Sequence, residues 1–183
     1  LLNNSTIKQQ IGARLQSLKR GQTGYLVVQD VDSFKKINDT NGHLFGDAVL
    51  CSFADELSNI FPEALKGRIG GDEFVFYVED MDREQLEEKL KQLNRCMSDR
   101  YDDDKTGLHI SCSLGAAVTD GTVTDYNLLF QWADAALYQV KSKGKGAYYL
   151  LDVKEGVALP GKSYLDSEEN KEDEIAHKLS LIH

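Results

Sequence analysis

Apolar residues recur at the three- and four-residue spacing of an amphipathic helix in four segments of the chain. The segments run from a cap at Ser5 or Thr6 to Gly21, from Phe45 to Pro62, over 82–99 and over 124–142. A shorter helical turn is expected over 34–37. The last long helix is predicted to bury five side chains: Leu128, Leu129, Trp132, Ala136 and Val140.

Strand-like segments lie between these helices. A buried strand follows Gly24 and leads into Asp30, a glycine-centred hairpin spans 64–79, apolar and polar residues alternate over 108–114, and a last strand covers 146–151. The order is helix, strand, helix, hairpin, helix, strand, helix, strand. This order predicts an α/β (α+β) fold with a mixed sheet covered by helices, not a doubly wound parallel sheet.

The totals fit one domain with an appendage, because 183 residues with 41% hydrophobic content are too few for two ordinary domains. We predict a domain over 1–151 and an acidic, solvated tail over 152–183, in which 175–182 begins a helix of something that follows. The net charge of -9 disfavours nucleic acid or an anionic membrane as a partner.

The cysteines and the lack of a long apolar stretch bear on the compartment. Cys51, Cys96 and Cys112 fall in periodic apolar segments without metal-binding spacing, so buried, reduced thiols are expected. No stretch reaches the roughly 18 continuous apolar residues of a membrane span. We predict a cytoplasmic location, either alone or as the cytoplasmic part of a larger sensor, with a regulatory domain upstream of Leu1.

Candidate chemistry gathers at two acidic motifs. Gly70 and Gly71 precede Asp72 and Glu73 at the predicted hairpin tip, where a glycine pair permits a tight turn and leaves a ligand's phosphates room against the peptide. Alone, this pattern is typical of an ordinary hairpin. Asp30 and Asp32 end a neighbouring strand, and four converging carboxylates require hard divalent cations such as Mg²⁺. Metal-assisted phosphoryl or nucleotidyl transfer fits such a site.

Several motifs in order resemble the GGDEF domain of diguanylate cyclases, over about residues 1–150. They are Asp30-Val31-Asp32-Ser33-Phe34-Lys35-Lys36-Ile37-Asn38-Asp39, Gly42-His43 with Gly46-Asp47, Gly70-Gly71-Asp72-Glu73-Phe74, Ser113-Leu114-Gly115, Ala133-Asp134-Ala135-Ala136-Leu137-Tyr138 and Lys141-Ser142-Lys143-Gly144. The P-loop and dinucleotide-binding signatures are missing from the sequence. The resemblance implies a five-stranded palm similar to adenylyl cyclase catalytic domains, with the signature on a β-hairpin.

The resemblance also implies the reaction, in which two GTP condense into cyclic di-GMP with release of two pyrophosphates. A 3′-hydroxyl attacks an α-phosphate across a two-fold homodimer. Asp30, Asp72 and Glu73 are the implied catalytic residues. With the backbone carbonyl of Val31, they would hold two Mg²⁺ (or Mn²⁺) ions in each active site.

Other residues would contact GTP. The resemblance assigns the phosphates to Lys35, Lys141 and Lys145, and close approach of the nucleotide to Gly70 and Gly71. It assigns guanine to Asn38 and Asp47, and an Asp47 carboxylate can accept from the N1–H and exocyclic amine that adenine does not offer together. Taken singly, these residues read as a turn or cap residue, a first-turn acid and surface lysines.

Asp32 has two readings. Strand periodicity puts it on the same face as Asp30 and makes it a ligand, whereas the resemblance makes it a support for the loop. The chain also departs from the family pattern. Phe61 and Ala64 occupy the Arg-x-x-Asp positions of the inhibitory product site, so no such site is expected. Lys145 replaces an arginine and lacks its bidentate fork.

Two other functions remain open at this point. The first is a non-catalytic domain that binds GTP as a regulatory signal, and the second is a dimerisation module without nucleotide affinity. The acidic pair and the base-reading residues are present, which favours the cyclase.

Overall fold

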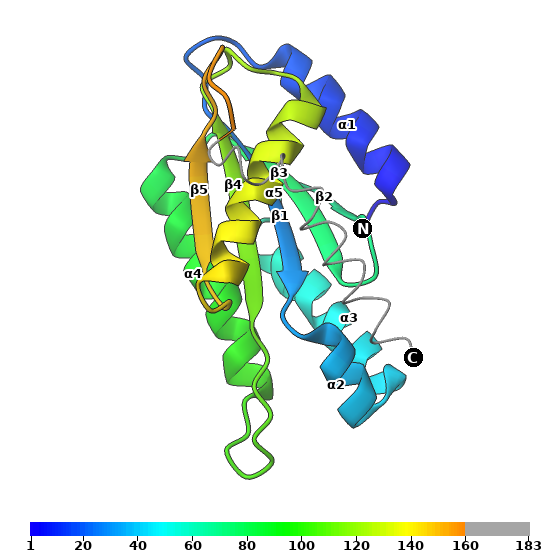
Figure 1. Cartoon of the computed structure of the whole chain (residues 1–183). Helices are drawn as coiled ribbons and strands as arrows, with labels where there is room; N and C mark the ends of the chain where they lie inside the picture. The colour runs from blue at the N-terminus through cyan, green and yellow to red at the C-terminus, as the bar shows by residue number, and fades with distance from the viewer. Residues whose placement is uncertain (160–183) are drawn as a thin grey trace, which may run out of the picture.

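The computed structural model describes residues 1–159 (Figure 1). A five-stranded sheet with the order β2-β3-β1-β4-β5 forms its centre. The strands are β1 (Gly24–Val31), β2 (Leu65–Arg68), β3 (Glu73–Glu79), β4 (Cys112–Thr119) and β5 (Tyr148–Asp152). β4 and β5 are parallel and the other neighbours are antiparallel. The predicted mixed sheet flanked by helices, with the signature on a hairpin, is confirmed.

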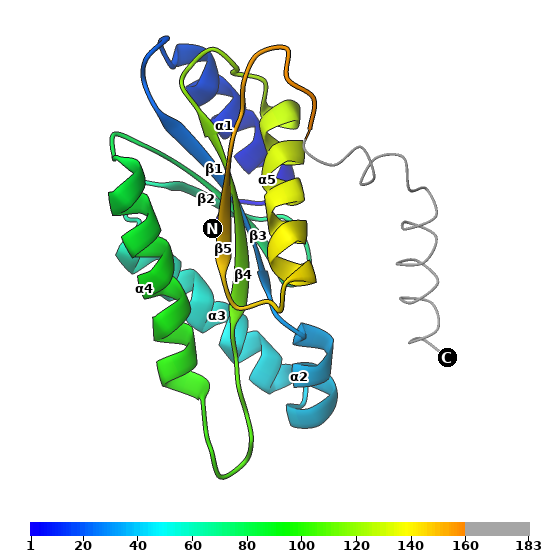
Figure 2. The ribbon, with the colours of Figure 1, turned by 60° about the vertical axis from the view of Figure 1, so that its left-hand side comes forward.

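Helices cover both faces of the sheet. The α1 (Asn4–Ser17) and α5 (Tyr126–Ser142) helices pack on one face, and α3 (His43–Ile60) and α4 (Arg83–Tyr101) pack on the other, as the side view in Figure 2 shows. Successive residues of β1 point to opposite faces of the sheet, so Leu26 packs with α1 and α5, whereas Val27 packs with α3 and α4. The short α2 (Phe34–Asn41) follows the end of β1.

Some predicted boundaries and side-chain positions are wrong. Asn3, not Ser5 or Thr6, caps α1, because its side chain accepts a hydrogen bond from the Thr6 N–H at 2.9 Å. The strand predicted over 108–114 begins only at Cys112, since the preceding residues form a loop closed by a bridge between Asp103 and Leu108.

Leu128 is 37% exposed, although it was predicted to be buried. It lies one position off the stripe that Leu129, Trp132, Ala136 and Val140 bury against the sheet. The cysteines also differ from one another. All three are free, but only Cys112 is buried, while Cys96 is half-buried and Cys51 is exposed. Cys51 is exposed because α3 turns other positions, such as Val49 and Phe53, toward the core.

The C-terminal prediction is only partly within the described residues. β5 includes Asp152, and Val153 is 3% exposed, so packing extends slightly past residue 151. The rest of the predicted tail from 160, including the helix expected over 175–182, lies outside the described residues. Among residues 1–159, no helix combines the length and apolar character needed to cross a membrane.

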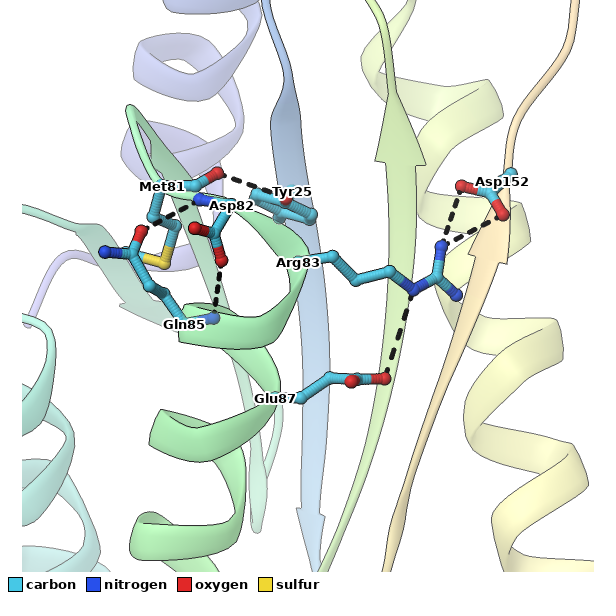
Figure 3. Close-up of polar contacts among 7 residues, drawn as sticks. All are labelled: Tyr25, Met81, Asp82, Arg83, Gln85, Glu87 and Asp152. Carbon is cyan, nitrogen blue, oxygen red and sulfur yellow. Dashed lines mark hydrogen bonds and ion pairs between the residues drawn. The ribbon is translucent and has the colours of Figure 1, made fainter.

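Polar contacts fasten α4 to the sheet at the end where β1 begins (Figure 3). The Tyr25 hydroxyl donates to the Met81 carbonyl at 3.1 Å, and Asp82 and Gln85 form a capping box at the start of α4. The Arg83 guanidinium donates to both carboxylate oxygens of Asp152 at 3.1 Å. We call these five residues the α4 clasp: Tyr25, Asp82, Arg83, Gln85 and Asp152.

Candidate active site

The hairpin of β2 and β3 carries the Gly-Gly-Asp-Glu signature at its tip. Arg68 holds this tip, because its guanidinium donates to the carbonyl oxygens of Gly70, at 3.2 Å, and Gly71. The Val31 N–H donates to the Asp72 carbonyl at 3.3 Å, which ties the tip to the end of β1. The two acidic motifs are distant in the sequence, and they meet at the end of the sheet where β1 terminates.

The glycine pair matters because it leaves steric room and not because its backbone dihedral angles are unusual. Neither Gly70 nor Gly71 has a positive φ, so the tight turn does not use the left-handed backbone conformation that glycine permits. A Cβ on Gly70 would lie 2.7 Å from the Glu73 carboxylate, whereas nothing lies within 4 Å of a Cβ on Gly71. The space where a side chain at position 71 would begin is therefore open.

Three carboxylates and one ammonium group form what we call the acidic edge: Asp30, Asp72, Glu73 and Lys141. Asp30 lies directly opposite Glu73 in the pairing of β1 with β3, so both side chains lie on the face that α5 covers. The Asp72 carboxyl group lies close enough to Asp30 to raise the pKa of the Asp30 carboxyl, and the Lys141 Nζ donates to Asp30 Oδ2. Lys141 comes from the C-terminal end of α5.

Burial changes the titration of this group. Asp30 is 7% exposed, and burial, together with the neighbouring Asp72 carboxyl, raises its pKa to about 7 in spite of the opposing effect of Lys141. Burial alone would lower the pKa of Lys141, but its hydrogen bond to Asp30 and the charges of the three acids raise it. Lys141 therefore carries its positive charge at neutral pH.

The donors at the edge fit a hard divalent cation. In the described part of the chain, no group of three or more His, Cys, Asp or Glu side chains is arranged to hold a metal ion. Two carboxylates, Asp30 and Asp72, nevertheless meet beside the Val31 backbone. Mg²⁺ characteristically uses one or two carboxylates and takes its other ligands from water and substrate phosphates, so this donor set suits Mg²⁺ or Mn²⁺.

Glu73 also lines a cavity next to the acidic edge. A cavity of about 520 Å³ lies among α1, the hairpin and α5, and Glu73 lines it together with Lys8, Tyr126 and Phe130. Glu73 is therefore part of the acidic edge, because it lies opposite Asp30 in the sheet, and it also lines this cavity.

Asp32 supports the loop beside the edge. Its carboxylate accepts hydrogen bonds from the Ser111 and Ser113 hydroxyls, both at 2.6 Å, and from the Gly146 N–H at 2.9 Å. Since these donors occupy both oxygens, the geometry favours the supporting role over the ligand role that periodicity indicated. The neighbouring Lys145 donates from Nζ to the Ser33 hydroxyl at 3.2 Å.

The residues expected to read guanine lie where α2 meets α3. A Cβ on Gly46 would lie 1.8 Å from Asn38 Oδ1, so glycine at this position leaves the space that the Asn38 side chain occupies. That oxygen has no hydrogen-bond partner among the described residues, although it is buried. Asp47 follows Gly46 on the surface of α3, and Lys35 is exposed on α2. An unpartnered amide beside an exposed carboxylate can receive a polar ligand edge.

Sequence reasoning missed three structural supports of the site. Arg68 fixes the hairpin tip, the Ser111 and Ser113 hydroxyls orient Asp32, and Gly46 admits Asn38. One sequence signal was available for the serines, because they are polar residues at alternate positions leading into an otherwise apolar strand. Their shared partner, Asp32, is 79 residues away from Ser111 in the sequence, so no local pattern identifies it.

Comparison with known proteins gives one family. The sequence profile described as "Diguanylate cyclase, GGDEF domain" matches residues 1–147. The chain is 32% identical over 144 residues to the probable diguanylate cyclase DgcT of Escherichia coli (strain K12), covering 76% of this chain and 32% of that protein. It is 37% identical over 128 residues to the diguanylate cyclase DgcS of Shewanella oneidensis, covering 68% and 41%.

A solved structure agrees with this family. The active GGEEF domain of a diguanylate cyclase from Vibrio cholerae superposes with a TM-score of 0.73 at 25% identity, covering 84% of this chain and 99% of that chain. The chain spans less than half the length of DgcT or DgcS, namely 32% and 41%.

Proposed function

Since this chain belongs to the diguanylate cyclase GGDEF domain family, we propose that it condenses two GTP molecules into cyclic di-GMP and releases two pyrophosphates. The observation that carries the proposal is the meeting of Asp30 and Asp72 beside the open peptide of Gly71. This edge joins a donor set for a divalent cation to space for a triphosphate.

In the proposed reaction, Asp30, Asp72 and the Val31 carbonyl hold Mg²⁺ or Mn²⁺, with Glu73 beside them. Diguanylate cyclases of this family are metal-dependent, and a bound cation supplies neutralisation of phosphate charge. Two ions in each site are part of the proposal. Gly70 and Gly71 let the α-phosphate approach the hairpin, while Arg68 keeps the tip in place.

The remaining contacts orient the nucleotide. Lys35, Lys141 and Lys145 bind phosphate oxygens through their ammonium groups. The Asp47 carboxylate accepts from the guanine N1–H and exocyclic amine, and the Asn38 amide pairs with the same nucleotide base, which selects GTP over ATP because a buried polar edge left unpaired costs binding energy. The unpartnered Asn38 Oδ1 supports this assignment.

Each copy of the domain holds one GTP, so two copies meet with their acidic edges facing each other. The 3′-hydroxyl of one nucleotide then attacks the α-phosphorus of the other, and two such attacks close the ring. A two-fold arrangement brings the same surface of each copy into contact. We also propose a cytoplasmic reaction controlled by a regulatory domain elsewhere in the full protein.

The test is to incubate the chain with GTP and Mg²⁺ over a range of protein concentrations and to identify the nucleotide products. The two-copy mechanism predicts cyclic di-GMP and pyrophosphate, with specific activity rising as protein concentration rises. Binding of GTP without pyrophosphate release at high concentration would instead indicate a regulatory domain. Absence of Mg²⁺-dependent nucleotide affinity would indicate a dimerisation module.

A further inference from the structure

The Lys141 ammonium group contacts a carboxylate of the acidic edge. Its Nζ donates to Asp30 Oδ2, and the two side chains are 37% and 10% exposed, respectively. Asp30 is the same carboxylate that the proposed function gives to the metal. The ammonium group and a divalent cation therefore compete for one acid.

The surroundings of this pair strengthen the competition. Glu73 lies directly opposite Asp30 in the β1–β3 pairing, and the Asp72 backbone is tied to Val31, so the Lys141 ammonium group offsets the repulsion among three neighbouring acids. A divalent cation that reached Asp30 alone would leave Lys141 without its partner and beside a like charge. A cation that arrived with a triphosphate would bring new anionic oxygens for the lysine.

Resting on the proposed function, we propose that Lys141 is an internal counter-cation that excludes free divalent metal from Asp30. Lys141 leaves Asp30 for the phosphates when a metal–triphosphate complex binds. Metal and nucleotide consequently bind as one unit, and the acidic edge does not collect free divalent cations. This role adds a metal-selecting step to a residue otherwise expected only to bind phosphate.

The opposite possibility makes a contrary prediction. If Lys141 only organises the carboxylates, its removal loosens the acidic edge and weakens the binding of metal. If it competes with metal, its removal strengthens the binding of metal in the absence of nucleotide. The sign of one affinity change therefore decides between the two roles.

The experiment measures Mn²⁺ affinity of the full chain without nucleotide, from the electron paramagnetic resonance signal of free Mn²⁺. We expect Lys141→Met to bind Mn²⁺ about tenfold more tightly than the unmodified chain, a typical size for coupling between two binding events. Lys143→Met is the matched control, because Lys143 lies over the Tyr149 ring, 5.6 Å from its centroid. It should leave Mn²⁺ affinity unchanged, as should Lys141→Arg, which keeps the charge.

The same titration with a non-hydrolysable GTP analogue separates this inference from the proposed function. The unmodified chain should bind Mn²⁺ and analogue together, and Lys141→Met should bind the analogue several-fold more weakly. Unchanged or weaker Mn²⁺ affinity in Lys141→Met would overturn the counter-cation role alone. Failure of the unmodified chain to bind Mn²⁺ with the analogue would overturn the proposed function.

Circular dichroism checks that each variant is folded before its affinity is interpreted. If Lys141→Met does not fold, Lys141→Gln replaces it, because glutamine removes the charge but can still donate to Asp30. The expected tighter binding of free Mn²⁺ and the contradicting result are the same for this variant.

Discussion

The two ends of the central sheet handle charge in opposite ways. At the α4 clasp, the Asp152 carboxylate accepts a hydrogen bond from the Arg83 guanidinium, and the Asp82 carboxylate accepts one from the Gln85 backbone N–H. The chain therefore supplies a partner for each of these two acids. At the acidic edge, the charges of Asp30, Asp72 and Glu73 all act on the ammonium group of Lys141. Like charges gathered this closely repel one another, and a bound cation would lower that cost.

This difference separates stability from function within one fold. Polar groups that the chain itself satisfies fasten α4 to β1 and β5 (Figure 3). The acids gathered at the acidic edge form the site that we propose for a cation and phosphates. Substitutions at the clasp should therefore change unfolding, whereas substitutions at the acidic edge should change turnover.

The largest expected effect is on turnover in Asp72→Asn. The amide keeps the side-chain shape but removes a charged ligand, so cyclic di-GMP formation should fall by about 10²- to 10⁴-fold. The melting temperature should stay level or rise, because repulsion with Asp30 is relieved. Pyrophosphate release and thermal unfolding measure the two quantities.

Asp152→Asn at the clasp is the matched control for that substitution. It weakens an exposed pair with Arg83, which costs about 0.2–1 kcal/mol of unfolding free energy, and should leave turnover unchanged. Unaltered turnover in Asp72→Asn, or lost turnover in Asp152→Asn, would contradict the division between the two ends.

The next effect is a dependence of stability on pH at Asp30. The pKa of this carboxyl is about 7 in the folded chain and 3.8 by reference, so the folded chain keeps a proton that the unfolded chain has released. The unfolding free energy of the unmodified chain should therefore fall, relative to Asp30→Asn, as pH rises from about 4 to about 7. Urea unfolding at several pH values tests this, and parallel pH profiles for the two proteins would refute it.

A smaller effect is expected at the start of α4. Asp82→Ala removes the capping box, so the unfolding free energy should fall by about 1 kcal/mol while each folded molecule keeps its turnover. Glu88→Ala serves as the control, because Glu88 is exposed on the same helix. Urea unfolding should show little change for the control, and equal destabilisation of both variants would argue against the cap.

The smallest expected effect is that of added cyclic di-GMP, which we expect not to bind at the position of Phe61 and Ala64. Phe61 is 2% exposed and Ala64 is 8% exposed, and Lys66 Nζ donates to the Phe61 carbonyl at 2.7 Å. The cavity there is only about 180 Å³ and lacks the arginine and aspartate of a product site. Added product should therefore not bind at this position. Tight binding of labelled product that substitution at Phe61 or Ala64 abolishes would contradict the prediction.

The sequence predicted the features that depend on periodicity and motif order. The buried strand leading into Asp30 and the hairpin carrying Asp72 follow from local patterns, and the mixed sheet follows from the order of the elements. Its five strands were implied by the family resemblance. The sequence did not reveal which side chains orient others across the sheet. Asp32 meets Ser111 and Ser113 only after β1 and β4 have paired, so its supporting role depends on tertiary contacts.

The remaining errors have local causes. Leu128 carries an apolar side chain just beside the buried stripe of α5, and Cys51 lies off the buried face of α3. Periodicity cannot resolve such neighbouring positions, because one residue turns only part of the way around a helix. The glycine pair was predicted at the right place for an incorrect backbone reason, since steric space and not φ distinguishes Gly70 and Gly71.

Anomalous diffraction from crystals grown with Mn²⁺ and a non-hydrolysable GTP analogue would locate both the metal and the nucleotide. We expect manganese peaks between the Asp30 and Asp72 carboxylates, with the triphosphate over Gly70 and Gly71. We also expect Lys141 to contact phosphate in place of Asp30. Nucleotide and manganese bound away from this edge, with Lys141 still on Asp30, would contradict the account.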